Sequence, residues 1–350
     1  AEAIAGIIDR CFTELIDEAY RYGGTLLQFG GDALLLFFPG DHHELRAAGA
    51  ALAMRASLRE TREDLPVVGR APLSMTVGVH SGDFDFFLVG ASHRQLVVGG
   101  PAASRLVELE EEASRGRILI SAETAAALPS ANVGVEEEVG IRLQGRLDPP
   151  APTRVEFFDA HIDVSRYVES EIRHAVSQGT VHSEHRTATL AFVHHRGLDD
   201  VLAEHGPEEA AARLDALVEG VQEPIVGRTI CFQSADTGSN GGKFYLTAGV
   251  PRSTGADEEA MLLALRDIVD LDVGLDLRAG VNSGPVFMGE IRTQHRNTFI
   301  TMGDAVNLAA RVTGKSRFGT VLSTQPVLDR SRTLFEETPC EPFMVKGKAK

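Results

Sequence analysis

Residues 75–82, Met75-Thr76-Val77-Gly78-Val79-His80-Ser81-Gly82, have a close counterpart about 200 residues later in Leu277-Arg278-Ala279-Gly280-Val281-Asn282-Ser283-Gly284. Each is an alternating apolar run closed by Ser-Gly, a pattern that predicts a buried strand ending in a turn. A short apolar run follows each of them, at 86–90 and at 286–289. A repeat spaced this widely is too long for a solenoid and predicts two related domains.

The correspondence continues upstream of both stretches. Residues 29–39 parallel residues 240–251, and both runs are typical of a β-hairpin whose Gly pair, Gly30-Gly31 or Gly241-Gly242, supplies backbone freedom at the turn. A helical pattern precedes each hairpin, at 4–22 and at 198–221. The two halves therefore share one order of elements.

The boundary between the halves lies in a polar, patternless segment, and the strand at 187–193 opens the second half. We predict a first domain at 1–162, a linker at 163–186 and a second domain at 187–350. Strands and helices alternate irregularly in both domains. This pattern favours an α+β fold with helices layered against a mostly antiparallel sheet.

Composition narrows the class of protein. A chain of 350 residues with a net charge of −16 is a poor partner for nucleic acid, although a small phosphate ligand needs only a few local donors. The three scattered cysteines favour a reducing cytosol over a disulfide framework. No apolar run is long enough for a membrane span and no signal-peptide pattern is present, so we predict a cytoplasmic location.

The stretch Thr301-Met302-Gly303-Asp304-Ala305-Val306-Asn307-Leu308-Ala309-Ala310-Arg311 predicts a strand end, a Gly turn and a helix starting near Asp304. Asn307 and Arg311 are four residues apart and share one face of that helix. An amide beside a guanidinium can position a sugar oxygen and neutralise a phosphoryl group. The bland alternative is a surface helix with a solvated Arg.

In this context the segment resembles the Asn/Arg signature of the class III nucleotidyl cyclases. Both halves of the chain are similar to cyclase homology domains, in the tandem arrangement of soluble adenylyl cyclases. The likeness extends to bacterial proteins in which such a pair precedes an ATPase-like and helical-repeat region. It implies two ferredoxin-like domains packed head to tail as a pseudo-symmetric pair, with nucleoside triphosphate bound at their interface.

The resemblance also implies a two-metal site for Mg²⁺ or Mn²⁺, held by two Asp residues of one domain. The hairpin Asp is present in the first half as Asp32, a hard oxygen ligand that could otherwise serve only as a turn-former. The aligned position in the second half is Gly242, followed by Lys243, and the strand position is occupied by His194. His194 and His195 should point to opposite faces of their strand and are poor co-ligands.

The Asn/Arg pair, by contrast, is present in the second half and missing from the first. Alignment of 100–108 with 303–311 places Ser104 at the Asn position and Glu108 at the Arg position. The resemblance then implies one composite pocket, in which Arg311 neutralises phosphoryl charge and Asn307 orients the ribose. Lys348 or Lys346 would grip the phosphates, and Thr301 could contact the base.

Two departures from the family pattern leave the function open. The first strand of domain 1, which carries the second metal Asp in the family, is not in this sequence. Residue 300 is Ile and 229–236 contain no Lys, so the usual adenine-recognising residues are missing and ATP is favoured over GTP only by overall likeness. The alternatives to an adenylate cyclase are a regulatory pseudo-cyclase and, more blandly, a protein-interaction scaffold.

Overall fold

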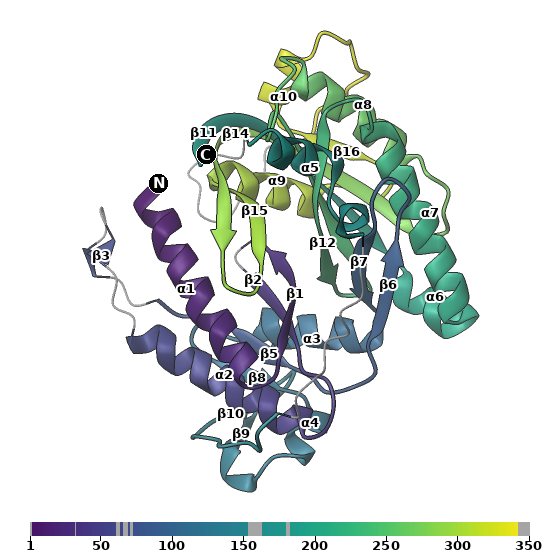
Figure 1. The fold of residues 1–350 in the computed structure, drawn as a ribbon. Coiled ribbons are helices and arrows are strands. Elements are labelled where there is room, and N and C mark those ends of the chain that lie inside the picture. The colour runs from purple at the N-terminus through teal and green to yellow at the C-terminus, as the bar shows by residue number, and fades with distance from the viewer. Residues whose placement is uncertain are drawn as a thin grey trace.

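The computed structural model describes residues 2–31, 33–60, 64–65, 69–70, 73–152, 163–179 and 183–341. It is a mixed α+β structure in which two halves of the chain pack against each other (Figure 1). The first half contains α1 (Glu2–Arg21), β1 (Thr25–Gly30), β2 (Ala33–Phe37), α2 (His43–Glu60), β3 (Asp64–Leu65), β4 (Gly69–Arg70), β5 (Val77–Val79), β6 (Asp85–Val89), β7 (Gln95–Gly99), α3 (Pro101–Glu112), β8 (Ile118–Ile120), α4 (Ala122–Ala126), η1 (Ser130–Asn132), β9 (Val133–Glu136) and β10 (Ile141–Leu143).

The second half follows a connecting segment that forms η2 (Val164–Tyr167) and α5 (Ser170–Ser177). Its elements are β11 (Glu184–Arg196), α6 (Leu198–His205), α7 (Pro207–Ile225), β12 (Ile230–Gly238), β13 (Gly241–Ala248), α8 (Asp257–Val269), β14 (Asp276–Arg292), β15 (Asn297–Met302), α9 (Asp304–Lys315), β16 (Val321–Ser323) and α10 (Gln325–Arg330). No helix in the ranges described above is long and apolar enough to cross a membrane.

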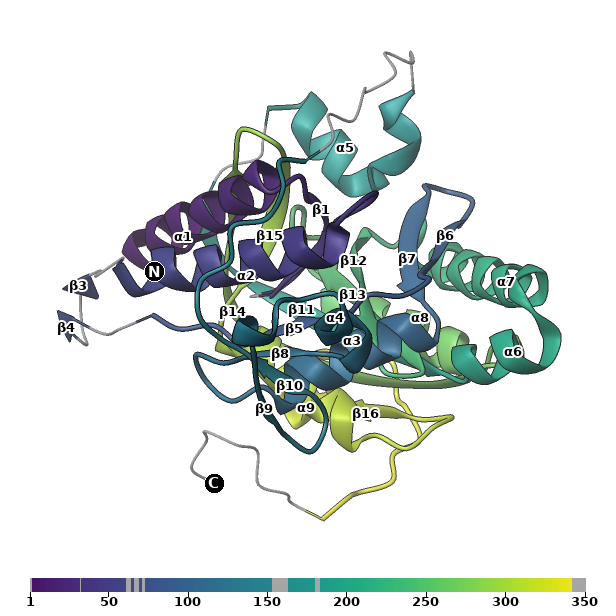
Figure 2. The same ribbon diagram turned by 90° about the horizontal axis from the view of Figure 1, so that it is seen from below.

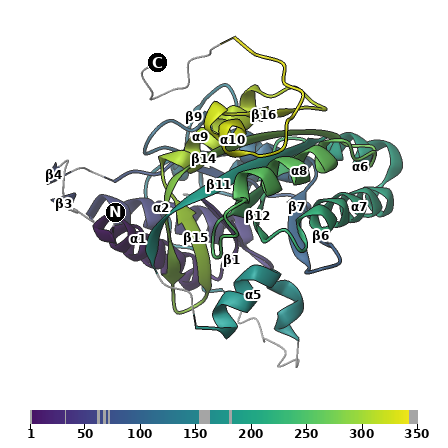
Figure 3. The ribbon, with the colours of Figure 1, turned by 90° about the horizontal axis from the view of Figure 1, so that it is seen from above.

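The second half is built on one sheet with the strand order β12-β13-β11-β14-β15, and β16 adds to β14 in parallel. Its central strand β11 is antiparallel to both neighbours, and residues 188–193 of that strand are buried. Helices α6 to α8 cover one face of the sheet, while α9 covers the other (Figure 3). Burial on both faces explains why the middle of β11 is apolar without alternation.

From α1 to β5 the first half follows the same order of main elements as α6 to β14 of the second, but its described strands form several separate sheets. Its strands form the hairpins β1–β2 and β6–β7, the short pair β3–β4, and a four-stranded sheet β5-β8-β10-β9. The parallel pairing of β5 with β8 matches that of β14 with β16. Figure 2 shows α1 and α2 lying side by side over this half.

Each half contacts the other through an equivalent helix and hairpin, as expected for a head-to-tail pair. Helix α1 of the first half packs against the β14–β15 hairpin, where Tyr20 stacks on His295 with ring centroids 3.7 Å apart. Helix α7 of the second half packs against β6, where Asp215 accepts a 2.8 Å hydrogen bond from the N–H of Gly90. The pseudo-symmetric arrangement expected from the repeat is confirmed.

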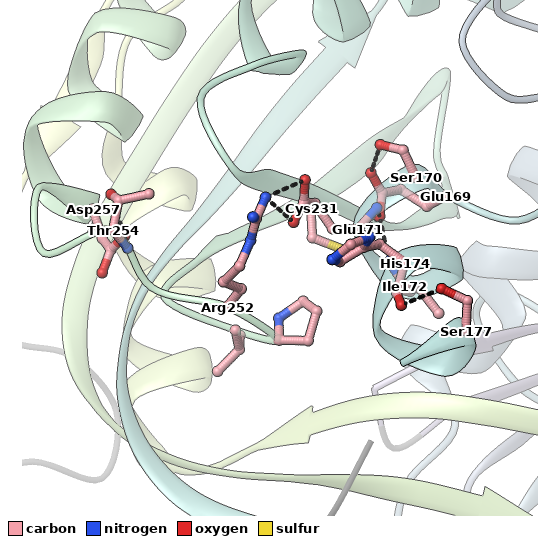
Figure 4. A network of polar contacts seen from close by, with 12 residues as sticks. Glu169, Ser170, Glu171, Ile172, His174, Ser177, Cys231, Arg252, Thr254 and Asp257 are labelled. Carbon is pink, nitrogen blue, oxygen red and sulfur yellow. Dashed lines mark hydrogen bonds and ion pairs between the residues drawn. The ribbon is translucent and has the colours of Figure 1, made fainter. Parts of the chain in front are cut away.

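The connecting segment is attached to the second half through Glu169 (Figure 4). The Glu169 carboxylate caps α5 by accepting hydrogen bonds from the N–H groups of Glu171 and Ile172, and it also accepts one from the Cys231 thiol at 3.2 Å. Burial raises the pKa of Glu169, although these hydrogen bonds act in the opposite direction. Arg252 adds an ion pair with Glu171, so α5 is held against β12 and the loop after β13.

Several details differ from the sequence-based expectations. The helix predicted at 198–221 is two helices, because Gly206 adopts a positive φ of 82° and Pro207 starts α7. The predicted turn after Ser283-Gly284 is absent, and β14 continues through it to a length of 17 residues, because residues 276–288 pair with β11. The linker predicted as patternless contains α5, and β11 begins at Glu184.

The hairpin turns also differ in one half. In the second half the Gly pair 241–242 begins β13, and the turn itself is Ser239-Asn240, with Asn240 at a φ of 50°. In the first half Gly31 occupies the turn at a φ of 67°, as predicted. The helices expected at 4–22 and from Asp304 are confirmed as α1 and α9.

Candidate active site between the two halves

Helix α9 presents the Asn307 and Arg311 pair on its outer side. Gly303 joins β15 to α9 at a φ of 152°, and a Cβ there would lie 3.1 Å from the Pro285 carbonyl oxygen. Ala305, Ala309, Val312 and Thr313 pack the inner face of the helix against the sheet. The spacing of these buried residues leaves Asn307 exposed and Arg311 half-buried.

No hydrogen bond or ion pair within the described ranges holds either of these two side chains. Their donors and acceptors are therefore available to a ligand. Lys346 and Lys348, the predicted phosphate contacts, lie outside the described residues, and so does Asp32.

Thr301 is positioned differently from the Asn/Arg pair. It lies on β15 and is 7% exposed, and its hydroxyl forms a 2.7 Å hydrogen bond with the Tyr245 hydroxyl. Burial raises the pKa of Tyr245, so the phenol stays neutral and can act as the donor. A substrate could bond to the Thr301 hydroxyl only by competing with the Tyr245 hydroxyl.

Asp236 of β12 reaches the first-half hairpin, and sequence reasoning did not single it out. A Cβ placed on Gly30 would lie 3.6 Å from the Asp236 carboxylate, which accepts a 2.9 Å hydrogen bond from Ser234 Oγ. Burial raises the pKa of Asp236 to about 6. The only signal in the sequence is a carboxylate directly after the uncharged run 230–235.

The equivalent position in the first half, on α3, is occupied by hydrogen bonds between residues of the protein. Ser104 of α3 donates a 2.6 Å hydrogen bond to Asp199 and accepts one of 2.7 Å from the backbone N–H of Asn240. Burial raises the pKa of Asp199, and the nearby carboxylates of Asp200, Asp85 and Glu108 raise it further. A pocket with this charge would repel a triphosphate.

The sequence matches the family "Adenylate and Guanylate cyclase catalytic domain" twice, over residues 11–158 and 181–350. The chain belongs to this cyclase family. The two matches coincide with the two halves of the structure, so the protein carries tandem cyclase homology domains. The class III resemblance and the α+β fold expected from the sequence are both confirmed.

Solved cyclase structures resemble the chain only distantly. The guanylyl cyclase Cya2 has a TM-score of 0.40 and 20% identity, covering 47% of this chain and 88% of its own. The guanylate cyclase domain of RhGC from Catenaria anguillulae, in complex with GTP, has a TM-score of 0.42 and 18% identity, with coverages of 47% and 93%. The adenylyl cyclase CyaB from P. aeruginosa has a TM-score of 0.37 and 18% identity, with coverages of 43% and 82%. No curated protein matches the chain.

Cyclases of this family generally use divalent metal ions, which side-chain oxygen, nitrogen or sulfur atoms would have to bind. The described residues contain no group of three or more His, Cys, Asp or Glu side chains that could hold an ion. His194 accepts a 2.9 Å hydrogen bond from Arg278, whereas His195 is fully buried beside Phe244 on the other face of β11. Burial lowers their pKa values to about 4 and about 3, respectively.

The described side chains therefore do not by themselves form the metal centre of a cyclase. Asp32 is the carboxylate that the family pattern provides, and it lies outside the described ranges.

Proposed function

We propose that the two cyclase domains convert ATP to 3′,5′-cyclic AMP and pyrophosphate at one composite site. The observation that carries this proposal is the contrast between the two equivalent helices. On α9, Asn307 and Arg311 face outward without a partner in the described chain, whereas on α3 Ser104 is bound to Asp199 and Asn240. One of the two pockets thus offers donors to a ligand and the other does not.

The composite site would combine residues of both domains. Arg311 would neutralise charge on the phosphoryl group while Asn307 orients the ribose. The 3′-hydroxyl would lose its proton to water and bond to the α-phosphorus as the bond to pyrophosphate breaks. Lys348 or Lys346 would hold the phosphates, and Thr301 would lie on the base side. Asp32 would be the protein's ligand for Mg²⁺ or Mn²⁺, and such an ion, when bound, offsets the charge of the triphosphate.

The choice of base depends on residues at the domain interface. Asp236 lies there beside the first-half hairpin, and its carboxylate can accept a hydrogen bond from an exocyclic amino group of either purine. ATP is proposed here from the overall likeness to soluble adenylyl cyclases. GTP is the competing substrate in any assay.

A regulatory pseudo-cyclase is the second candidate function. One observation favours it: the Thr301 hydroxyl, the predicted contact to the base, is already bonded to Tyr245. A module of this kind would pass a signal to other domains, such as an ATPase-like or helical-repeat region, without turnover.

The experiment is cyclic-nucleotide production from ATP and from GTP with Mn²⁺, using the chain, Arg311→Ala and Asp32→Ala. Loss of a transition-state donor typically lowers kcat by about 10²–10³-fold, and we expect Arg311→Ala to fall in that range. Glu108→Ala, at the matching position of α3, is the control and should retain activity. No turnover of either nucleotide by folded protein would leave the regulatory function.

A further inference from the structure

Helix α9 lies unusually close to the strand beneath it, β14. Gly280, Asn282 and Gly284 alternate along β14 and therefore share one face of the strand. A Cβ on Gly280 would lie 2.3 Å from the backbone nitrogen of Thr313, and a Cβ on Gly284 would lie 2.9 Å from the Ala305 Cβ. A side chain at either glycine would push α9 away from the sheet. The two glycines therefore set how closely the backbone of α9 approaches β14.

Asn282 lies between these glycines and bonds directly to the backbone of α9. Its side chain is 4% exposed, and its Nδ2 donates a 3.0 Å hydrogen bond to the carbonyl oxygen of Ala305, in the first turn of the helix. Its Oδ1 accepts a 3.0 Å hydrogen bond from the Thr324 hydroxyl. Because both ends of the amide are bonded, the donor end is kept toward α9. This bond opposes sliding and rotation of the helix on the strand.

The hydroxyl of Thr324 is used to orient Asn282. Thr324 stands at the N-cap position of α10, where a Thr side chain commonly accepts a hydrogen bond from the first turn of its own helix. Thr324 makes no such bond. At the start of α4 in the first half, Ser121 does cap its helix and accepts a hydrogen bond from the N–H of Thr124. The second half thus uses a typical capping residue to hold an amide beneath α9.

The first half lacks the corresponding connection to its helix. His80 takes the place of Asn282 in the repeat, and its Nδ1 forms a 2.9 Å hydrogen bond with the Ser121 hydroxyl. Among the described residues, no hydrogen bond joins His80 to α3. The close approach itself is retained, since a Cβ on Gly78 would lie 2.7 Å from the Leu106 carbonyl oxygen. The bond to the helix backbone is therefore found in the half that carries the Asn/Arg pair.

We propose that Asn282 is a positioning residue that holds α9 so that Asn307 and Arg311 meet the substrate in the productive geometry. Ala305, the residue bonded to Asn282, precedes Asn307 by two residues and Arg311 by six, so a shift of the first turn moves both side chains. A misplacement of about 1 Å can lower a rate by about 100-fold. The inference rests on the proposed function, because it assigns α9 a part in turnover. Asn282 itself acts only through the helix backbone.

The first test compares Asn282→Leu with a matched control, Asn132→Leu. Leu is similar in size to Asn and cannot form the hydrogen bonds. Asn132 is also 4% exposed, and its Nδ2 donates 3.0 Å hydrogen bonds to the carbonyl oxygens of Gln144 and Arg146 in the first half. We expect Asn282→Leu to lower kcat for cyclic-nucleotide production by roughly 10–100-fold with KM changed less than about threefold, and Asn132→Leu to keep kcat within about twofold.

A double-mutant cycle with Arg311→Ala separates positioning from a general loss of structure. If Asn282 acts by placing the Asn/Arg pair, the loss of kcat caused by Asn282→Leu should shrink to a few-fold in the Arg311→Ala background, because one of the two placed groups is already gone. A merely structural role would give the same fold-loss in both backgrounds. Parent turnover with such additive losses would overturn the inference alone, whereas no turnover by the parent would overturn the proposed function and this role together.

Hydrogen exchange of the amides at 308–311 tests the connection without relying on activity. Asn282→Leu should speed their exchange by roughly tenfold or more, and Asn132→Leu should leave it unchanged. Thr324→Val is the milder variant, because it keeps Asn282 and removes only the hydroxyl that orients its amide; it should change kcat and exchange in the same direction by a smaller factor. Unchanged exchange at 308–311 in both Asn282→Leu and Thr324→Val would overturn the proposal.

Discussion

Gln222 joins the two domains through hydrogen bonds to Ala91, Ser92 and His93, and its replacement by Met tests the head-to-tail interface. The side chain projects from α7 and is 2% exposed. Its oxygen accepts hydrogen bonds from the N–H groups of Ala91 (2.8 Å) and Ser92 (2.9 Å), and its nitrogen donates to the His93 carbonyl (2.8 Å). Met has a similar length and removes all three bonds.

The expected effect follows from the number of groups left without a partner. Each of these three hydrogen bonds contributes about 0.5–1.5 kcal/mol, because Ala91 and Ser92 are exposed and water can replace the lost partner of their N–H groups. A total of about 2 kcal/mol, near the lower end for three bonds, corresponds to a roughly 30-fold increase in the opening of the loop.

Hydrogen exchange of the Ala91 and Ser92 amides measures this opening directly, because these amides are the donors to Gln222. Glu223→Met, at the exposed neighbouring position on α7, is the control and should leave their exchange unchanged. Cyclic-nucleotide production should also fall in Gln222→Met, since a composite site needs both domains in place. Unchanged exchange at 91 and 92 would refute the role assigned to Gln222.

Three further predictions concern single side chains. The folded-state pKa of Asp236 is raised to about 6, so its contribution to stability is present below the unfolded value of 3.8 and is lost as the pH rises through 6. Between pH 4 and pH 7 the free energy of unfolding of Asp236→Asn should therefore rise by on the order of 2 kcal/mol relative to the parent, which urea unfolding measures. Ser104→Ala should lower the free energy of unfolding by about 1–3 kcal/mol, because Asp199 and the Asn240 N–H lose their partner; equal urea midpoints would contradict this. A thiol reagent should label the exposed Cys340 in the native protein and the buried Cys231, whose pKa burial raises, only after unfolding; rapid native labelling of both would show that Cys231 is accessible.

The sequence predicts best those elements whose signal is local. Helix α9 was predictable because Gly303 and Asp304 mark its start and its apolar residues recur with helical spacing. The repeat predicted the paired domains, since equivalent strands keep equivalent apolar runs even at this divergence. Asn307 and Arg311 followed from the same helix, because residues four apart must share a face.

The features that escaped prediction depend on distant parts of the chain. Helix α5 is short and polar, and it is held by contacts of Glu169 and Glu171 with Cys231 and Arg252, more than 60 residues away along the chain. Strand β14 continues through Ser283-Gly284 only because β11 pairs with it on that side. Asp236 became a site candidate only when the fold placed it against Gly30. None of these contacts leaves a periodic pattern in the sequence.

The equivalent helices α3 and α9 differ in how they connect the two domains. Under the proposed function, Ser104 and Glu108 of α3 stand at the positions that Asn307 and Arg311 occupy on α9. Ser104 bonds to the second-half hairpin and to the start of α6, so this side of the pair would help to fix the relative position of the domains. The α9 side of the pair could not be closed in this way without replacing Asn307 and Arg311, the two residues that the proposed function requires.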